Sequence, residues 1–368
     1  MWLTNSSIGR KFVMALTGCC LVLFVTFHVL MNAVAIFWPT AYNAICGFLG
    51  ANWYALIASA GLAALFIVHI IYAIWLTIQN RRARGNDRYE VTTIPPHVEW
   101  SSQNMLVLGI VIVAFLAVHM IQFWAKMQLV EALHTPMTDF PQVNGVVAAP
   151  EFGTLFLQAA FQEIWTPIVY IIGFAALWFH LNHGFWSMLH TIGWNNNIWM
   201  ERLRKIGLWW SSIVVGLFFI QAVVFYVKAN DPENNYLQDP ALQEQYAEFW
   251  AEQAETIVPE FQSQLNEYMA NVPQTQEAMQ QAQTAFIQEK LPALVERAEY
   301  IVAGFDAQCS KVAEPEAITG VKQFASQMKY YIMTVAPQVQ QPAAAPVQQP
   351  DEQQPAEQPA PEQQSDNQ

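Results

Sequence analysis

Five segments of this chain are long and apolar enough to cross a lipid bilayer, which takes about 20 residues of this kind. They cover residues 12–38, 53–78, 105–124, 165–189 and 206–227. Inside a bilayer every backbone N–H and C=O group needs a partner within the protein, so segments of this length must be helical. The sequence therefore predicts an all-α membrane protein built on a five-transmembrane-helix bundle. The first segment lacks a small-residue cleavage site, so we expect it to remain as a helix.

Composition separates a membrane part from an acidic tail. Hydrophobic residues make up 54% of the chain and charged residues only 12%, whereas roughly a quarter of the residues in a soluble domain are charged. Residues 1–228 carry 11 basic and 8 acidic side chains, and the remainder carries 5 and 21. The sequence contains no phosphate-binding loop, dinucleotide fingerprint or nucleophile elbow, so we expect no nucleotide chemistry, no acyl transfer and no nucleic-acid partner.

The acidic tail divides again near residue 337. Residues 229–336 keep scattered aromatic residues among Glu, Gln and Ala, which predicts short helices outside the membrane. An apolar stripe at helical spacing within residues 323–335 would lie on a membrane or on a partner; it comprises Phe324, Met328, Tyr331, Ile332 and Val335. Residues 337–368 are Gln, Pro, Ala and Glu with few large apolar residues, a composition that predicts disorder.

The distribution of basic residues predicts how the bundle is oriented. Arg10 and Lys11 precede the first segment, Arg81 and Arg82 follow the second, and further basic residues separate the fourth from the fifth. By the positive-inside rule the N-terminus is cytoplasmic and the acidic tail extracytoplasmic, which is the periplasm if the membrane is the cytoplasmic (inner) membrane of a Gram-negative bacterium.

Two of the four cysteines would share the oxidising side of the membrane. Cys46 and Cys309 both fall on the outer side in this topology, which predicts a disulfide between them. No cysteine spacing indicates a metal site.

Four of the eight histidines stand one to a helix in apolar surroundings: His28, His69, His119 and His180. A buried imidazole in hydrocarbon needs a partner, and for any one of them a hydrogen bond to a neighbouring helix is as good an explanation as a metal. Each lies roughly 15 residues along its helix, so His28 and His119 share the outer half and His69 and His180 the inner half, at levels roughly 10 Å apart. Two pairs at two depths is the arrangement that two bis-histidine haems require. His183 is the alternative to His180.

The sequence resembles a known family, the single-chain, five-helix, di-haem cytochrome b subunits of succinate dehydrogenases and fumarate reductases, especially the Bacteroidetes-like branch. The resemblance covers residues 7–228. It rests on Ser-Ile-Gly-Arg-Lys before the first helix, on the helical histidines, and on His-Leu-Asn-His-Gly-Phe-Trp-Ser, which begins at His180. In the family the fourth ligand stands four residues before the glycine of that motif, which implies His180 rather than His183. The family pairing implies an outer haem b on His28 and His119, and an inner haem b on His69 and His180.

The resemblance also implies a function. Such a subunit is the membrane anchor of a succinate:quinone oxidoreductase and passes electrons between an iron–sulfur subunit and a quinone, which the resemblance implies is menaquinone. The dicarboxylate chemistry belongs to a flavoprotein subunit, so we expect no catalytic residue here. Relatives that reduce fumarate can carry a glutamate where this chain has Trp178, which leaves the direction of turnover open. Two alternatives remain: the cytochrome b of a hydrogenase or formate dehydrogenase, and a haem-free membrane scaffold.

Further side chains are candidates for binding the quinone or the partners. A quinone needs an apolar slot and a hydrogen-bond donor beside the outer pair. The polar residues expected there are Asn32, Tyr42, Asn43, Asn52, Trp53 and Gln122. The basic residues at the cytoplasmic rim would pair with haem propionates or dock the iron–sulfur subunit, although topology alone also explains them; they are Arg10, Lys11, Arg81, Arg82, Arg202 and Arg204.

Overall fold

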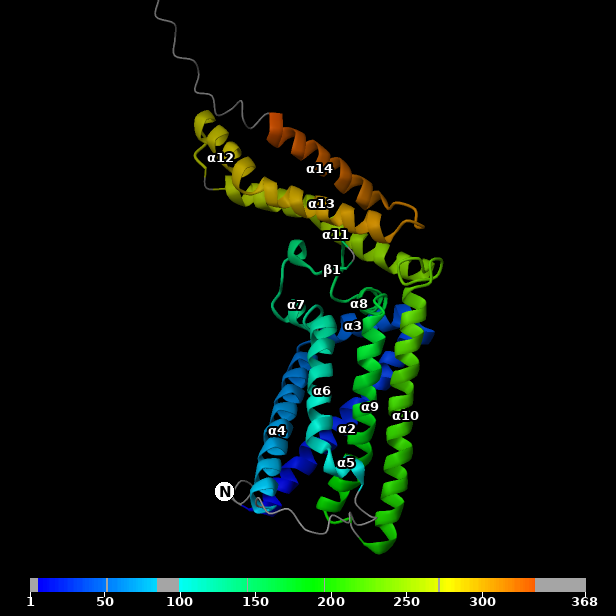
Figure 1. The fold of residues 1–368 in the computed structure, drawn as a ribbon. Coiled ribbons are helices and arrows are strands. Elements are labelled where there is room, and N and C mark those ends of the chain that lie inside the picture. The colour runs from blue at the N-terminus through cyan, green and yellow to red at the C-terminus, as the bar shows by residue number, and fades with distance from the viewer. Residues whose placement is uncertain are drawn as a thin grey trace, which may run out of the picture.

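The molecule consists almost entirely of helices, arranged in three layers. The structure, a computed structural model, describes residues 6–50, 52–84, 99–143, 145–194, 196–270 and 272–334. A bundle of long helices forms the first layer, a group of short elements covers one of its ends, and a helical cap lies across that group (Figure 1).

The bundle contains the helices that the sequence predicts. Its members are α2 (Ser7–Phe37), α4 (Trp53–Arg84), α6 (Met105–His119), α9 (Trp165–Thr191) and α10 (Asn197–Ala229). Within the described residues these five helices, with α6 extended to Trp124, are long and apolar enough to cross a membrane. The five-helix prediction is therefore confirmed, and the chain is a multi-pass membrane protein.

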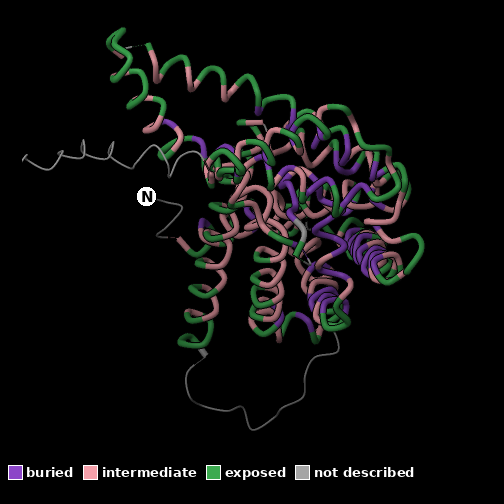
Figure 2. The backbone as a smooth tube through the Cα atoms, turned by 90° about the horizontal axis from the view of Figure 1, so that it is seen from above, coloured by how far each residue is buried: buried purple, intermediate pink, exposed green. Residues whose placement is uncertain are grey.

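Burial within the bundle fits a lipid environment. Ile67 and Ile71 on α4 are 55% and 53% exposed, and similar apolar side chains line the outside of the other bundle helices. Most of α2, α4 and α6 is half-buried or exposed, whereas buried residues gather on α9, α10, α8 and α13; Figure 2 colours the chain by burial. An apolar surface of this extent is stable in hydrocarbon and would be a liability in water.

Short elements form an outer layer over one end of the bundle. They are α3 (Pro39–Gly50), a π-helical turn η1 (Met120–Trp124), α7 (Gln128–Ala132), a 3-10 turn η2 (Met137–Asp139), the antiparallel strands β1 (Gln142–Val143) and β2 (Val146–Val147), and α8 (Gly153–Phe161). Gly145 has a φ of 77°, which glycine accepts at the strand turn. The small helix α5 (Trp100–Gln103) lies at the opposite end of the bundle (Figure 1).

The cap consists of α11 (Pro240–Met269), α12 (Gln276–Glu289), α13 (Leu291–Gln308) and α14 (Glu316–Thr334). The prediction of short helices is wrong for α11, which has 30 residues. Its core residues Leu242, Tyr246 and Trp250 recur every four positions and are fully buried, and such a stripe sustains a long helix even in a polar sequence.

The apolar stripe of α14 packs inside the cap. Phe324, Met328 and Ile332 contact the buried cluster of Phe286, Leu291 and Val295 on the neighbouring cap helices. The expectation that this stripe lies on a membrane or a separate partner is therefore wrong for these three residues, because α12 and α13 supply the apolar surface that covers them, whereas Tyr331 is 39% exposed. Val335 and the tail from 337 to 368, predicted to be disordered, lie outside the described residues.

The predicted disulfide is also wrong, because Cys46 and Cys309 are both free thiols. Cys46, on α3, contacts Tyr42 and the backbone of Gly153, whereas Cys309 ends α13 and is 2% exposed in the core of the cap. Burial raises the pKa of each thiol to about 12. The two side chains occupy different layers, each satisfied by its own neighbours.

Candidate functional site

The structure brings together the two histidine pairs that the sequence suggests. His28 on α2 faces His119 at the end of α6, with ring centres 5.8 Å apart and planes at 82°. His69 on α4 faces His180 on α9, with ring centres 6.3 Å apart and planes at 64°. Each pair joins two helices that are far apart in the sequence.

The spacing within each pair leaves room for one metal between the rings. Two imidazoles bound to opposite sides of a metal through bonds of about 2 Å have ring centres about 6 Å apart. No group of three or more His, Cys, Asp or Glu residues able to hold a metal ion occurs in the part of the chain that the structure describes. A pair of histidines without a third protein ligand suits an iron whose other four positions a porphyrin fills.

The two pairs lie at different depths. Thr17, which contacts His69, is eleven residues before His28 on α2, and a helix rises about 16 Å over that distance. Tyr170, which contacts His119, is ten residues before His180 on α9, which corresponds to about 15 Å. Both helices therefore place the two histidine pairs further apart in depth than the roughly 10 Å expected from the sequence. That expectation holds only if all apolar segments start at the same depth.

A hydroxyl group orients His69 in the inner pair. Thr17 Oγ1 lies 3.1 Å from His69 Nδ1 and donates its own proton to the Val13 carbonyl at 2.9 Å. The hydroxyl must therefore accept the Nδ1 proton, which leaves the Nε2 lone pair free for a metal. His180 Nδ1 is buried without a hydrogen-bond partner among the described residues. An unpaired buried nitrogen costs about 1–3 kcal/mol, and a metal on Nε2 of this ring would leave Nδ1 unpaired.

In the outer pair a hydroxyl group likewise contacts the Nδ1 atom of His119. Tyr170 Oη lies 3.1 Å from His119 Nδ1 and donates to Gln122 Oε1 at 2.8 Å, so it too accepts the Nδ1 proton. His28 is arranged differently, because its Nε2 lies 3.3 Å from Asn32 Nδ2. His69 and His119 thus fit metal ligation through Nε2 as they stand, whereas His180 lacks an Nδ1 partner and His28 must turn away from Asn32 to present Nε2.

Aromatic side chains enclose the outer pair. Phe24 stacks on His28 at 5.3 Å, and Phe115 and Phe123 lie against His119 at 6.0 and 5.3 Å. The π-helical turn η1 begins directly after His119, and such turns often accompany functional sites because they redirect a side chain. The rings exclude water from the space around the outer histidines.

His183, the alternative inner ligand, makes other contacts. Its Nδ1 lies 3.2 Å from Glu99 Oε2, and its ring meets Trp186 at 4.9 Å. The structure therefore brings His180, and not His183, to His69.

The predicted quinone residues separate into two groups. Asn32, Tyr42 and Gln122 lie at the outer pair, where the Tyr42 hydroxyl donates to Asn32 Oδ1 at 3.3 Å. Asn43 is instead engaged by α8 and α11. Asn52 and Trp53 stand at the start of α4, where Asn52 accepts from the Tyr54 backbone and Trp53 packs on the Tyr54 ring. The structure does not bring these last three residues to the histidines.

The basic candidates all occur near the inner end of the bundle. The Arg10 guanidinium lies over Trp75 at 5.5 Å, and that of Arg204 over Trp186 at 4.5 Å. Arg202 lies over Trp199 at 5.4 Å. The remaining three candidates are exposed; they are Lys11, Arg81 and Arg82.

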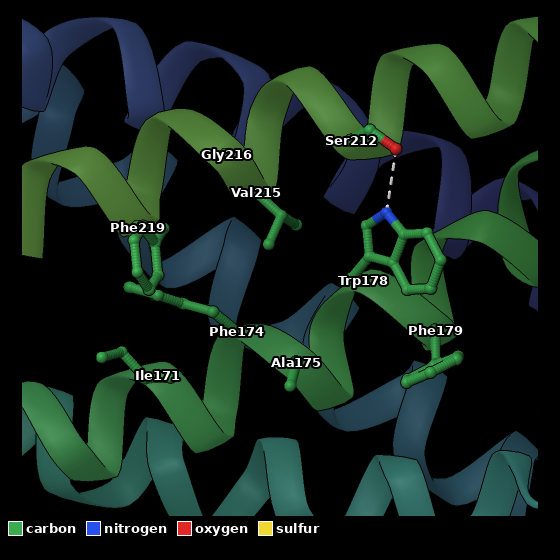
Figure 3. Close-up of a pocket in the computed structure, with 9 residues that line it drawn as sticks. All are labelled: Ile171, Phe174, Ala175, Trp178, Phe179, Ser212, Val215, Gly216 and Phe219. Atoms are coloured by element: carbon green, nitrogen blue, oxygen red, sulfur yellow. Dashed lines mark hydrogen bonds between the residues drawn. The ribbon is translucent and has the colours of Figure 1, made fainter.

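An apolar groove runs between α9 and α10 (Figure 3). Its volume is about 400 Å³, and Phe174, Trp178 and Phe219 line it. The Trp178 indole donates to Ser212 at 3.0 Å. Among the described residues, no carboxylate lines this groove.

Thr17 and Tyr170 are the site residues that the sequence does not reveal, since nothing in a single sequence shows which hydroxyl faces which histidine. Comparison with protein-family models, curated proteins and solved structures finds no match to this chain.

Proposed function

We propose that this chain is the di-haem cytochrome b membrane anchor of a succinate:quinone oxidoreductase. The proposal is carried by the two histidine pairs. In each pair the ring centres are separated by about the distance expected for two imidazoles on opposite sides of one metal. The resemblance of residues 7–228 to that family supplies the enzyme class, which the geometry alone does not.

In this proposal His28 and His119 hold the outer haem b, and His69 and His180 the inner one. Haem iron supplies one-electron transfer, and ligation by histidine on both faces leaves no position for oxygen. Thr17 and Tyr170 keep the Nδ1 protons of His69 and His119 in place, so that each ring offers Nε2. The aromatic side chains around the outer pair keep water away.

The two ends of the bundle have different proposed partners. Asn32, Tyr42 and Gln122 would hydrogen-bond a quinone, menaquinone by resemblance, beside the outer pair. Arg10 and Arg204 would meet haem propionates or the iron–sulfur subunit at the inner end. A flavoprotein subunit would carry the dicarboxylate chemistry. The N-terminus is then cytoplasmic and the cap extracytoplasmic, in a bacterial inner membrane.

Haem content of the purified chain tests the proposal. We expect a reduced-minus-oxidised spectrum of cytochrome b and two haems per chain. His180→Ala is expected to lose the inner haem, whereas the matched variant His183→Ala keeps both. Purified protein without cytochrome b absorbance would favour the haem-free scaffold and overturn the proposal.

The subunits that purify with the chain test the enzyme class. A flavoprotein and an iron–sulfur protein with succinate:quinone reductase or fumarate reductase activity are expected. A hydrogenase or formate dehydrogenase subunit in their place would retain the haems and reject the enzyme assignment.

A further inference from the structure

The cap has no role in the function proposed so far, yet buried polar contacts tie it to the outer layer. The cap helix α11 crosses above α3 and α8, at the end of the bundle that holds the outer histidine pair (Figure 1). Buried hydrogen bonds between segments this far apart in sequence are costly to leave unmade, so they fix relative position.

Asn43 of α3 is the centre of these contacts. It is 2% exposed, and its Oδ1 accepts from the Thr154 backbone at 3.0 Å and from the Thr154 hydroxyl at 2.9 Å. Its Nδ2 donates to Gln245 Oε1 on α11 at 3.0 Å. Because the Thr154 hydroxyl proton is used on Asn43, the Tyr246 hydroxyl, 2.7 Å away, must donate to Thr154. We call these four residues the cap joint.

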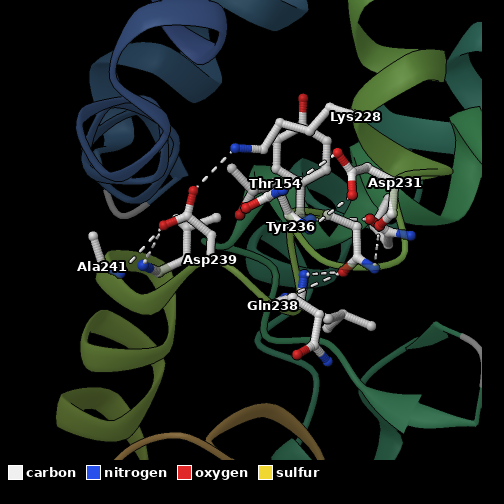
Figure 4. A network of polar contacts seen from close by, with 12 residues as sticks. Thr154, Lys228, Asp231, Tyr236, Gln238, Asp239 and Ala241 are labelled. Carbon is white, nitrogen blue, oxygen red and sulfur yellow. Dashed lines mark hydrogen bonds and ion pairs between the residues drawn. The ribbon is translucent and has the colours of Figure 1, made fainter.

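A second group of contacts holds the start of α11. Gln158 on α8 donates to the Ala229 carbonyl at 2.8 Å and accepts from the Tyr236 backbone at 3.2 Å. Lys228 pairs with Asp239, the N-cap residue of α11, at 2.9 Å (Figure 4). The end of the last membrane helix and the first turn of the cap are therefore fixed to the same outer layer.

The cap joint and the outer site are linked by two neighbouring residues in the sequence of α3. Tyr42 precedes Asn43 on α3, and its hydroxyl reaches Asn32, whose Nδ2 is 3.3 Å from His28 Nε2. Gln245 also donates to the Thr40 carbonyl at 3.3 Å, so α11 holds the first turn of α3 at two points. The placement of α3 decides where the Tyr42 hydroxyl lies relative to His28.

We propose that the cap positions α3 over the outer histidine pair, and that the cap joint sets the affinity of the outer site for quinone. Asn43, Thr154, Gln245 and Tyr246 are then positioning residues, and Asn43 itself does not bind the quinone. This inference rests on the proposed function, because it assigns the joint to the quinone site.

The test compares two tyrosines of the same helix in the full complex. Tyr246→Phe removes the hydroxyl of the joint, and Tyr268→Phe removes a hydroxyl that bonds Glu289 within the cap at 3.3 Å. Gln245→Leu removes both the acceptor for Asn43 and the donor to the Thr40 carbonyl, whereas Gln245→Glu removes only the donor. The measurements are hydrogen exchange of residues 39–50, the two haem potentials, and KM and kcat with a soluble naphthoquinol.

Tyr246→Phe and Gln245→Leu are expected to raise KM about fivefold, the equivalent of one hydrogen bond. Both should change kcat little, speed exchange in α3 and move only the outer haem potential. Tyr268→Phe should behave as the unaltered protein, and Gln245→Glu should raise KM less than Gln245→Leu. Unchanged KM and outer potential in both joint variants, or an equal change in Tyr268→Phe, would overturn the inference and leave the proposed function standing. Unaltered protein without haem would overturn both.

Discussion

Replacing Thr17 by valine removes one hydrogen bond from His69 and little else. Valine has nearly the shape of threonine, and the Val13 carbonyl that loses the hydroxyl proton keeps its place in α2. His69 then has no acceptor for its Nδ1 proton, so the ring is a weaker electron donor to a metal on Nε2. A weaker donor stabilises the oxidised metal less, so on the proposed function the potential of the inner haem should rise.

The size of the change follows from the 3.1 Å contact between Thr17 Oγ1 and His69 Nδ1. A hydrogen bond of this kind contributes about 1 kcal/mol net. A tenfold change in an equilibrium constant is about 59 mV for one electron, so the inner potential should rise by about 40 mV. Tyr170→Phe removes the corresponding contact from His119 and should raise the outer potential by a similar amount.

Each variant is the control for the other in a spectroelectrochemical titration. Thr17→Val should shift one haem and leave the second at its original potential, and Tyr170→Phe should do the reverse. If each variant shifts both potentials equally, or Thr17→Val shifts neither, the hydroxyls do not act through the rings they contact.

Three further predictions concern packing, pH and thiol chemistry. A Cβ at Gly173 would lie 2.4 Å from Phe115 Cγ, so Gly173→Ala should destabilise the protein by about 1–3 kcal/mol, seen as a lower melting temperature with early loss of the outer haem. Burial and the Glu151 charge raise the pKa of Glu131 from 4.5 to about 7. Its contribution to stability is therefore present at low pH and lost as pH rises through about 7, and Glu131→Gln should raise the melting temperature more at pH 8 than at pH 5. Cys309, with a pKa raised to about 12, should react with a thiol reagent at pH 8 only after denaturation.

The bundle was predictable because lipid imposes a strong and local signal. A run of about 20 apolar residues has one stable form in hydrocarbon, and a histidine in such a run stands out. Depth along a helix is also countable, so His28 and His119 could be grouped apart from His69 and His180. The rotation of each helix about its axis cannot be obtained by counting residues. The sequence therefore did not reveal that Thr17 and Tyr170 face the histidines.

The cap was harder to predict because the apolar residues that form its core are spread over a long stretch of the sequence. The buried residues of α11 are a minority among Glu and Gln, and their covering helices lie up to 80 residues further along the chain. The same limit explains Asn43, expected at the quinone site and found in the cap joint. A polar residue next to Tyr42 is equally consistent with either role until α8 and α11 are placed.

Tryptophans at the two ends of α9 relate the histidine pairs to the bilayer. Trp165 opens the helix at the outer layer and Trp194 follows its inner end, and they are 46% and 59% exposed. The 27-residue helix between them is about 40 Å long, which matches a bilayer with its interfacial regions, where tryptophan concentrates. On this scale Tyr170 lies about 8 Å below the outer tryptophan and His180 about 22 Å below it. The outer pair is then close to the depth of lipid head groups and of the layer that the cap holds in place. The inner pair is near the middle of the membrane. On the proposed function, a quinone ring carried at the outer interface would therefore reach the outer pair without crossing the hydrocarbon core, and this depth supports the proposal that the outer haem, held by His28 and His119, exchanges electrons with it.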